Sequence, residues 1–269
     1  GGLLPLGKRV EVVAGEKVIA RSGSATTKRD RPWVNAGIRI TSYLLLIAVW
    51  YLVSKMAGLA KVPPPERVWE ELVKIFSDGL FLRNFLATMT MFLEAVGIGF
   101  AIGAVVGVLM GRTHYFEAFF RDGVTIIMGL PGVVIIIVSL MMFGLSPWGR
   151  VTAVAVGLIP FVAINIAEGA RAVPRDLLTM AASFEVPQMR RLRQVVMPST
   201  APYVFTAARY ALATGFKAAA MVEVFGGSSG MGFQLRSSFS RFAVDAVLAW
   251  TFLILAIVII LELGILKPA

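Results

Sequence analysis

The sequence contains no cysteine and only one histidine, His114, which stands in a polar stretch. Without thiols there can be no disulfide bonds or thiolate chemistry, and a zinc site of imidazole and thiolate ligands is not expected. Charge is scarce too, because 16% of the residues are charged, whereas about 25% is usual for a soluble domain. These absences argue against a metal centre, against a bound cofactor and against a soluble globular fold.

Hydrophobic residues, in contrast, make up 57% of the 269 residues. Several apolar runs approach or exceed the roughly 20 residues that cross a bilayer as a helix. A transmembrane β-barrel does not fit, because it needs short alternating segments rather than continuous runs. The sequence therefore predicts an all-α membrane protein with about six transmembrane helices. The expected spans are residues 40–59, 84–110, 123–144, 151–169, 200–222 and 244–264.

Basic residues set the predicted orientation. The formal net charge is +10, but Lys and Arg gather in the N-terminal tail and between residues 171 and 193. This pattern favours a topology signal over a nucleic-acid-binding surface, and no nucleic-acid partner is expected. With the N-terminus inside, sixteen Lys and Arg lie in inside segments and seven in outside segments. We therefore expect a multi-pass membrane protein with both termini in the cytoplasm.

Residues 1–38 are predicted to form a cytoplasmic tail, and residues 39–269 the transmembrane domain. The first thirty residues are polar, so no cleavable signal peptide is visible, and the run that begins near Ile40 is expected to act as an uncleaved anchor. Within the tail, residues 9–20 read either as a small β-hairpin about Gly15 or as a disordered stretch.

Two local patterns predict how the helices pack. Glycines recur every four residues in the second span, which places them on one helix face and lets another helix approach closely; they are Gly99, Gly103, Gly107 and Gly111. Pro131 lies inside the third span, where it removes a backbone hydrogen bond and is expected to bend the helix or to expose carbonyl groups toward a cavity.

A third pattern lies in the first outside loop, residues 62–79. Prolines at its start are followed by Val68, Leu72 and Ile75 at helical spacing. This arrangement predicts a short amphipathic helix on the outer membrane surface.

Two segments look like phosphate loops but do not fit that function. Residues 2–9 match the spacing G-x-x-x-x-G-K, yet Arg9 stands where a Ser or Thr should hold magnesium. Residues 225–233 are rich in glycine, but the predicted topology places them outside, where cytoplasmic ATP cannot reach them. The chain is therefore expected to have no ATPase site of its own.

The segment 177–198 is amphipathic and much longer than a turn between two spans requires. Arg175 to Phe184 can form one short helix, Glu185 and Pro187 interrupt it, and Met189 to Met197 can form a second. A stiff helix–turn–helix transmits displacement, whereas a flexible loop would absorb it. This segment, within a loop at about 171–198, is therefore expected to be a stiff connection between two spans.

The same segment resembles the cytoplasmic loop of the integral-membrane permease subunits of bacterial ABC importers. That loop carries Glu-Ala-Ala, three residues, a Gly, and later an apolar pair before Pro. When Val196 to Pro198 are set on the apolar pair and proline, Met180 and Ala181 fall on the two alanines, Thr179 on the Glu and Glu185 on the Gly. Because a Gly there gives a tight turn, often with positive φ, we expect Glu185 to resist that conformation.

Other segments resemble one branch of this family, the permeases for nitrate, sulfonates, taurine, bicarbonate and related small compounds. They are VPPPERVWEEL, LATMTMFLEAVGIGFAIGAVVGVLMG, GARAVPRDLL, MPSTAPYVFTAARYALA and VEVFGGSSGMGF, within about residues 60–265. The resemblance implies a type I ABC importer permease fold in a bacterial inner membrane and import of a small, anionic solute. It also implies an ATPase-coupling site, at Thr179, Met180, Ala181, Ala182, Ser183, Phe184 and Glu185.

The partners implied are two ATP-binding subunits, a second permease chain (as homodimer or heterodimer), an extracytoplasmic solute-binding protein and membrane lipid. Nucleotide-driven closure of the ATPase subunits would rotate the spans through this loop. Departures from the family pattern at Thr179 and Glu185 fit either one half of a heterodimeric pair or an adapted ATPase surface.

Ionisable groups inside or near spans are costly unless they pair or face water, so they mark candidate sites. Glu94, Pro131, Lys217 and Glu223 are the candidate translocation-pathway residues, and Glu223 matches a usual family Glu. Lys217 can bind an anion, form a structural ion pair or reach the interface with its ammonium. Since Glu223 is six residues away on the same helix, its partner must lie elsewhere, and Glu94 is one candidate.

The two alternative classes are a secondary transporter and an intramembrane enzyme. A secondary transporter often shows inverted repeats, and none is visible here. An intramembrane enzyme needs a nucleophile–base pair or metal ligands within the spans, and Glu94 has no neighbouring Asp. The sequence thus favours a transport subunit rather than an enzyme.

Overall fold

The computed structural model describes residues 32–57 and 62–266 of the chain. Most of the predicted tail, including the expected hairpin and the segment 2–9, lies outside these residues. The chain divides into two units, residues 1–47 and 48–269. The described residues form α-helices and one short π-helix (η1), with these bounds: α1 Pro32–Ala57, α2 Pro65–Ser77, α3 Leu80–Arg112, α4 His114–Gly129, α5 Gly132–Phe143, α6 Pro147–Arg171, α7 Arg175–Ser183, α8 Gln188–Arg191, η1 Leu192–Val196, α9 Met197–Gly226, α10 Met231–Ser240 and α11 Val244–Leu266.

Five of the six predicted spans fall on single helices, namely α1, α3, α6, α9 and α11. Within residues 32–57 and 62–266, four helices are long and apolar enough to cross a membrane, or up to five if α4 and α5 count as one broken span. The helix α9 is not among them, although it is 30 residues long. It contains Arg209 and Lys217, and these two charged residues lower its mean hydropathy.

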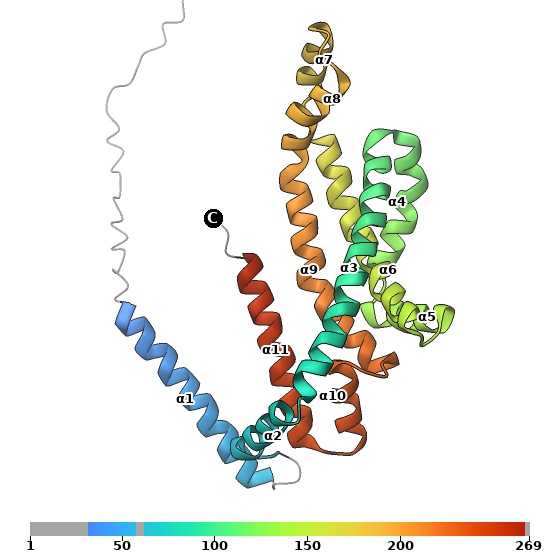
Figure 1. The fold of residues 1–269 in the computed structure, drawn as a ribbon. Helices are drawn as coiled ribbons and strands as arrows, with labels where there is room; N and C mark the ends of the chain where they lie inside the picture. The colour runs from blue at the N-terminus through green and yellow to red at the C-terminus, as the bar shows by residue number, and fades with distance from the viewer. Residues whose placement is uncertain (1–31, 58–61, 267–269) are drawn as a thin grey trace, which may run out of the picture. The chain divides into compact units, whose positions relative to one another are not determined.

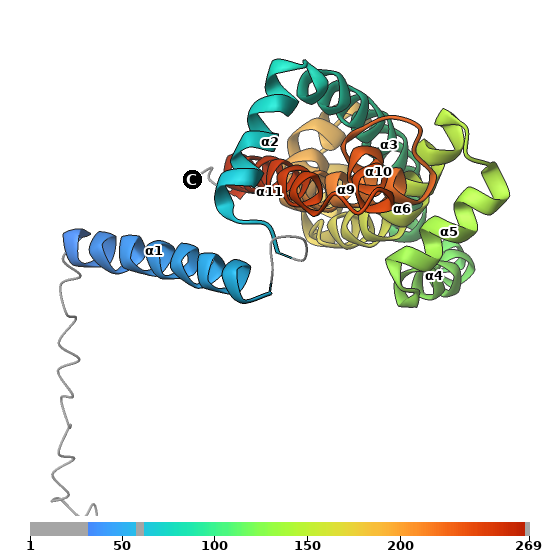
Figure 2. The same cartoon turned by 90° about the horizontal axis from the view of Figure 1, so that it is seen from below.

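In the second unit, α3, α6 and α9 pack against one another as the centre of the bundle (Figure 1). The short helices α7 and α8 lie at one end of this bundle, and α2 and α10 lie at the other end. Seen along the bundle from that second end, α10 covers the ends of the central helices (Figure 2). Between the ends, the rings of Phe92 on α3 and Phe216 on α9 pack edge to face, with 5.7 Å between the ring centroids, and both side chains are buried.

The predicted glycine face of α3 is confirmed, and it packs on α6. A methyl group added at Gly103 would lie 2.7 Å from the Cβ atom of Val162, and one at Gly107 would lie 2.7 Å from that of Ile166. Ordinary carbon–carbon contacts are about 3.5–4.0 Å. The two backbones can therefore lie this close only because these side chains are absent.

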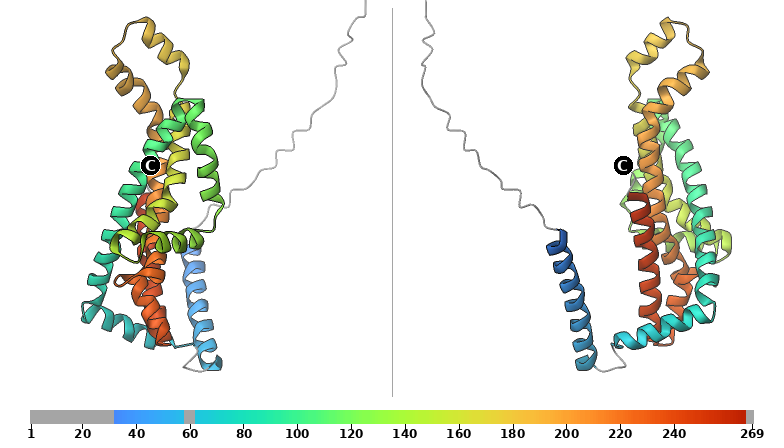
Figure 3. Two further views of the ribbon diagram at one scale, coloured as in Figure 1. Left: turned by 90° about the vertical axis from the view of Figure 1, so that its right-hand side faces the viewer. Right: turned by 60° about the vertical axis from the view of Figure 1, so that its left-hand side comes forward.

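The expected third span, residues 123–144, is not one continuous helix. The helix α4 ends at Gly129 and α5 begins at Gly132, and the two are bent by 109° (Figure 3). Steric conflict with the ring of Pro131 disfavours helical backbone at the preceding residue, and Leu130 is accordingly extended, with φ −80° and ψ 138°. The predicted bend is thus confirmed, but it is a break with glycines on either side.

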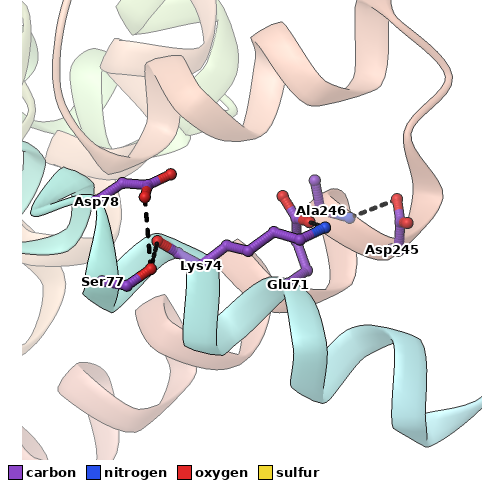
Figure 4. A network of polar contacts seen from close by, with 6 residues as sticks. All are labelled: Glu71, Lys74, Ser77, Asp78, Asp245 and Ala246. Atoms are coloured by element: carbon purple, nitrogen blue, oxygen red, sulfur yellow. Dashed lines mark hydrogen bonds and ion pairs between the residues drawn. The ribbon is translucent and has the colours of Figure 1, made fainter.

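The predicted amphipathic helix is α2, which begins at Pro65. Its Val68 and Ile75 are buried in the core of the chain rather than left free for lipid, whereas Trp69 remains exposed. Also on α2, the Nζ atom of Lys74 lies 3.3 Å from Oε2 of Glu71, and this ion pair lies next to the start of α11 (Figure 4).

Candidate functional site

The segment between α6 and α9 is a helix–turn–helix that projects beyond the bundle (Figure 3). The helix α7 covers Arg175–Ser183, and α8 with η1 runs directly into α9 at Met197. The predicted break at Glu185 and Pro187 is confirmed, but the second predicted short helix, Met189 to Met197, is not separate, because it continues into α9. The structure adds a π-helical turn at Leu192–Val196, a feature that often occurs at functional sites.

The turn after α7 is closed by two backbone hydrogen bonds. The N–H of Glu185 donates to the carbonyl of Ala182 at 3.0 Å, and the N–H of Val186 donates to that of Ala181 at 3.0 Å. This is the pattern of a Schellman motif, in which the residue directly after the C-cap is left-handed and is therefore normally Gly. Glu185 nevertheless adopts this conformation, with φ 51°, although a side chain there carries the steric cost that was expected. The backbone bonds of the motif offset the steric cost of a side chain there.

The tip of this helix–turn–helix carries large apolar side chains without cover in the chain. The exposed fraction is 56% for Met180, 75% for Phe184 and 73% for Met189. Thr179, Ala182, Ser183 and Glu185 are exposed as well, and Ala181 is half-buried. Apolar groups gathered in this way on a projecting element are typical of an interaction surface.

A buried polar cluster occupies the opposite end of the bundle. The carboxylate oxygen Oε2 of Glu223, on α9, accepts a hydrogen bond from the hydroxyl of Thr88, on α3, at 2.8 Å and another from the N–H of Gly232 at 2.9 Å. The Thr88 oxygen in turn accepts from the N–H of Met231 at 2.9 Å. Asn84 Oδ1 accepts from the N–H of Gly230 at 3.1 Å. Glu223 is 1% exposed and Thr88 is fully buried.

Glycines leave room for this cluster. Gly230 has φ 102°, and an added Cβ atom there would overlap the Glu223 carboxylate. At Gly232 an added Cβ atom would lie 2.8 Å from the Cβ atom of Glu223. The glycine-rich loop therefore uses its amides on the chain's own side chains, which agrees with the expectation that it is not a phosphate loop.

Lys217 forms an ion pair with a residue that sequence reasoning did not name. Its Nζ atom lies 2.5 Å from Oε1 of Glu262 on α11. The side chains are 53% and 36% exposed, respectively. Lys217 thus has a partner on another helix, which is one of the three alternatives that the sequence left open, and the partner is Glu262 and not Glu94.

The four predicted pathway residues come from three places in the fold, α3, the α4–α5 break and α9. Glu94 is exposed on α3, Pro131 lies at the α4–α5 break, Lys217 is half-exposed on α9, and Glu223 is buried near the end of α9. Within the described residues, no hydrogen bond or ion pair joins any two of them.

Sequence reasoning also missed Asn84 and Thr88. Both are polar residues within or beside the second predicted span, and a spacing of four places them on one helix face. That pattern could have been noticed. Their partners are backbone amides some 140 residues away in sequence, so nothing local identifies what they bind.

The fold has a counterpart among solved structures. A chain of the MetNI methionine ABC transporter, in a structure of inward-facing conformations, matches 70% of this chain and 94% of its own length, with a TM-score of 0.56 and 20% identity. The architecture is that of a type I ABC importer permease. The chain itself belongs to the family of binding-protein-dependent transport system inner membrane components, whose pattern matches residues 80–266.

Curated relatives point to the same family. The chain is 23% identical over 235 residues to the taurine transport system permease protein TauC of Escherichia coli (strain K12), covering 85% of this chain and 86% of TauC. It is 25% identical over 224 residues to the bicarbonate transport system permease protein CmpB of Synechococcus elongatus, covering 78% and 80% of the two chains. Family membership confirms a multi-pass transport subunit of an inner membrane and decides against an enzyme or a secondary transporter.

Proposed function

We propose that this chain forms the pathway by which an ATP-driven importer carries a small anionic solute into the cell. The relatives are named for the transport of taurine, which carries a sulfonate group, and of bicarbonate, which is an anion. Transport draws its energy from two separate ATP-binding subunits, and an extracytoplasmic binding protein delivers the solute. The chain has both termini in the cytoplasm, as the distribution of basic residues favours.

The ATPase subunits dock on residues Thr179 to Glu185. The observation that carries this assignment is the projecting α7 turn, whose exposed Met180 and Phe184 need an apolar partner surface. Because α8 and η1 continue into α9, a push on α7 reaches a helix that runs to the far end of the bundle.

The pathway lies between this chain and a second permease chain, and Glu94, Pro131, Lys217 and Glu223 belong to it. Support comes from two features of the single chain. Lys217 is half-exposed although it is paired, and the α5 side chains Met141 and Met142 are 81% and 73% exposed. A cation near the pathway favours an anionic solute.

The docking assignment is tested by two charged substitutions on the exposed face of α7, Ala182→Glu and Ser183→Arg. Each should abolish co-purification of the ATPase subunits or uncouple ATP hydrolysis from the binding protein, while the chain still folds and inserts. The matched control is Gln194→Glu, which adds a charge on exposed η1 outside the docking face. Normal coupling in both α7 variants would show that the docking surface is elsewhere.

Orientation is tested with single cysteines, which the chain lacks naturally. In intact cells an impermeant maleimide should label cysteine at the exposed positions Ser77 and Ser240, and should not label cysteine at Gln188. Labelling at Gln188 would refute the proposed topology. Uptake of radiolabelled taurine, bicarbonate and nitrate by cells expressing the complete system then tests the solute class.

A further inference from the structure

The helix α10 is capped by side chains that belong to other helices. The first N–H groups of any helix lack partners within it and need acceptors from elsewhere. Here the N-cap residue is Gly230, which has no side chain to offer. Its own N–H and those of Met231 and Gly232 donate instead to Asn84, Thr88 and Glu223.

Glu223 has a special place among these three acceptors. It bonds both to α10 and to Thr88 of α3, so one carboxylate holds three helices together. Asn84 and Thr88, in contrast, are both carried by α3.

The position of Glu223 along α9 connects it with the other end of the protein. The helix α9 follows η1 directly and has 30 residues, which corresponds to about 45 Å at 1.5 Å per residue. Glu223 stands three residues before its end at Gly226. The helix that begins next to the projecting α7–α8 segment therefore ends at the carboxylate that caps α10.

We propose that Glu223 is a positioning residue that transmits movement of α9 to the outer loop, residues 227–230, and to α10. When α9 moves, the bonded N-terminus of α10 moves with it, because Gly230 and Gly232 pack directly against the Glu223 side chain. Asn84 and Thr88 provide the fixed side of this contact on α3. The direction of the signal, from ATPase to outer loop, depends on the function proposed above; the capping contact does not.

The contact is tested on the full chain in nanodiscs of phosphatidylethanolamine and phosphatidylglycerol, by hydrogen exchange of residues 227–235. Glu223→Ala should raise exchange of the Gly230 to Gly232 amides about tenfold or more. Glu223→Gln retains an acceptor and should restore most of the protection. The control Glu71→Gln, a carboxylate of α2 outside this cluster, should leave exchange unchanged. Equal exchange in wild type and Glu223→Ala would overturn the proposal.

Thr88 gives a second, milder test in case Glu223→Ala does not fold. Thr88→Val removes the bridging hydroxyl with little change of shape, and Thr88→Ser keeps it. Raised exchange at residues 227–235 in the first variant and protection in the second are expected. The same exchange in both would show that the hydroxyl bridge does not hold α10.

Transmission is tested in the complex with the ATPase subunits, by comparing the nucleotide-free state with the state trapped by ATP and vanadate. In wild type, exchange should differ between the two states both at residues 177–186 and at residues 227–235. In Glu223→Ala the difference at 177–186 should remain and that at 227–235 should vanish, with recovery in Glu223→Gln. If both differences persist in Glu223→Ala, Glu223 only supports the fold. If wild type shows no difference at 177–186, the proposed docking function fails instead.

Discussion

Replacing Gly103 by alanine tests whether the close approach of α3 and α6 holds the bundle together. The added methyl group would lie 2.7 Å from the Cβ atom of Val162 and 2.9 Å from the carbonyl oxygen of Ile159. The carbonyl is backbone, which no rotamer change can move away, so the two helices must separate by about 1 Å to restore ordinary contact distances of about 3.5 Å or more.

The magnitude follows from two opposing effects. Overpacking of a well-packed core costs about 1–3 kcal/mol, and Gly to Ala in a helix contributes about 1 kcal/mol of stability. We expect Gly103→Ala to lower the free energy of unfolding by up to about 2 kcal/mol. Gly97, on the same helix, is the matched control, because an added methyl group there meets nothing within 4 Å. Gly97→Ala should keep only the favourable helical contribution.

The assay is thermal unfolding of the purified chain in one detergent, followed by intrinsic fluorescence. A change of 1 kcal/mol corresponds to about 2–4 °C for a protein of this size, so the two variants should move the midpoint in opposite directions. Equal shifts for Gly103→Ala and Gly97→Ala would refute close helix packing as the role of the glycine face.

Other substitutions test individual contacts. Glu185→Gly and Phe242→Gly each relieve a left-handed residue, with φ 51° and 56°, and should stabilise their turns by about 1 kcal/mol, seen as roughly fivefold slower exchange of the following amide. Lys217→Met should lower the yield of folded protein if the pair with Glu262 is structural, and the exchanged pair Lys217→Glu with Glu262→Lys should restore it; rescue by a change at Glu94 would contradict the structure. For a half-exposed pair the stabilisation is about 1 kcal/mol or less, so unchanged yield with abolished solute uptake would instead assign Lys217 to the pathway.

The break between α7 and α8 could be predicted from sequence, because its signals are local. Pro187 and the helical spacing of apolar residues indicate where α7 ends and α8 begins. They did not indicate that α8 and η1 continue through Pro198 into α9. The conformation of Glu185 could not be predicted, since a side chain in the left-handed region is unfavourable by itself. Two backbone bonds, to Ala181 and Ala182, hold it there, and they exist only once α7 has formed.

The buried polar cluster at Glu223 shows the opposite case. Glu223 could be singled out because a carboxylate near a span is costly unless it has partners. Which partners it has depends on how α3, α9 and α10 meet, and Thr88 lies 135 residues away in sequence. The pairing of Lys217 with Glu262, 45 residues away, depends on packing in the same way.

Sequence alone determined that the chain is a helical membrane protein, where most of its helices lie, and which face of α3 is made of glycines. These properties follow from hydropathy, from helical period and from the missing side chains of glycine, all of which are properties of neighbouring residues. Only the tertiary structure decided that α4 and α5 are bent by 109° relative to each other. It also decided that Asn84, Thr88 and Glu223 accept the hydrogen bonds from the first N–H groups of α10. A proline permits a bend but does not set its angle, and an unpaired amide requires an acceptor without specifying which one. Both are settled by the helices that pack around them.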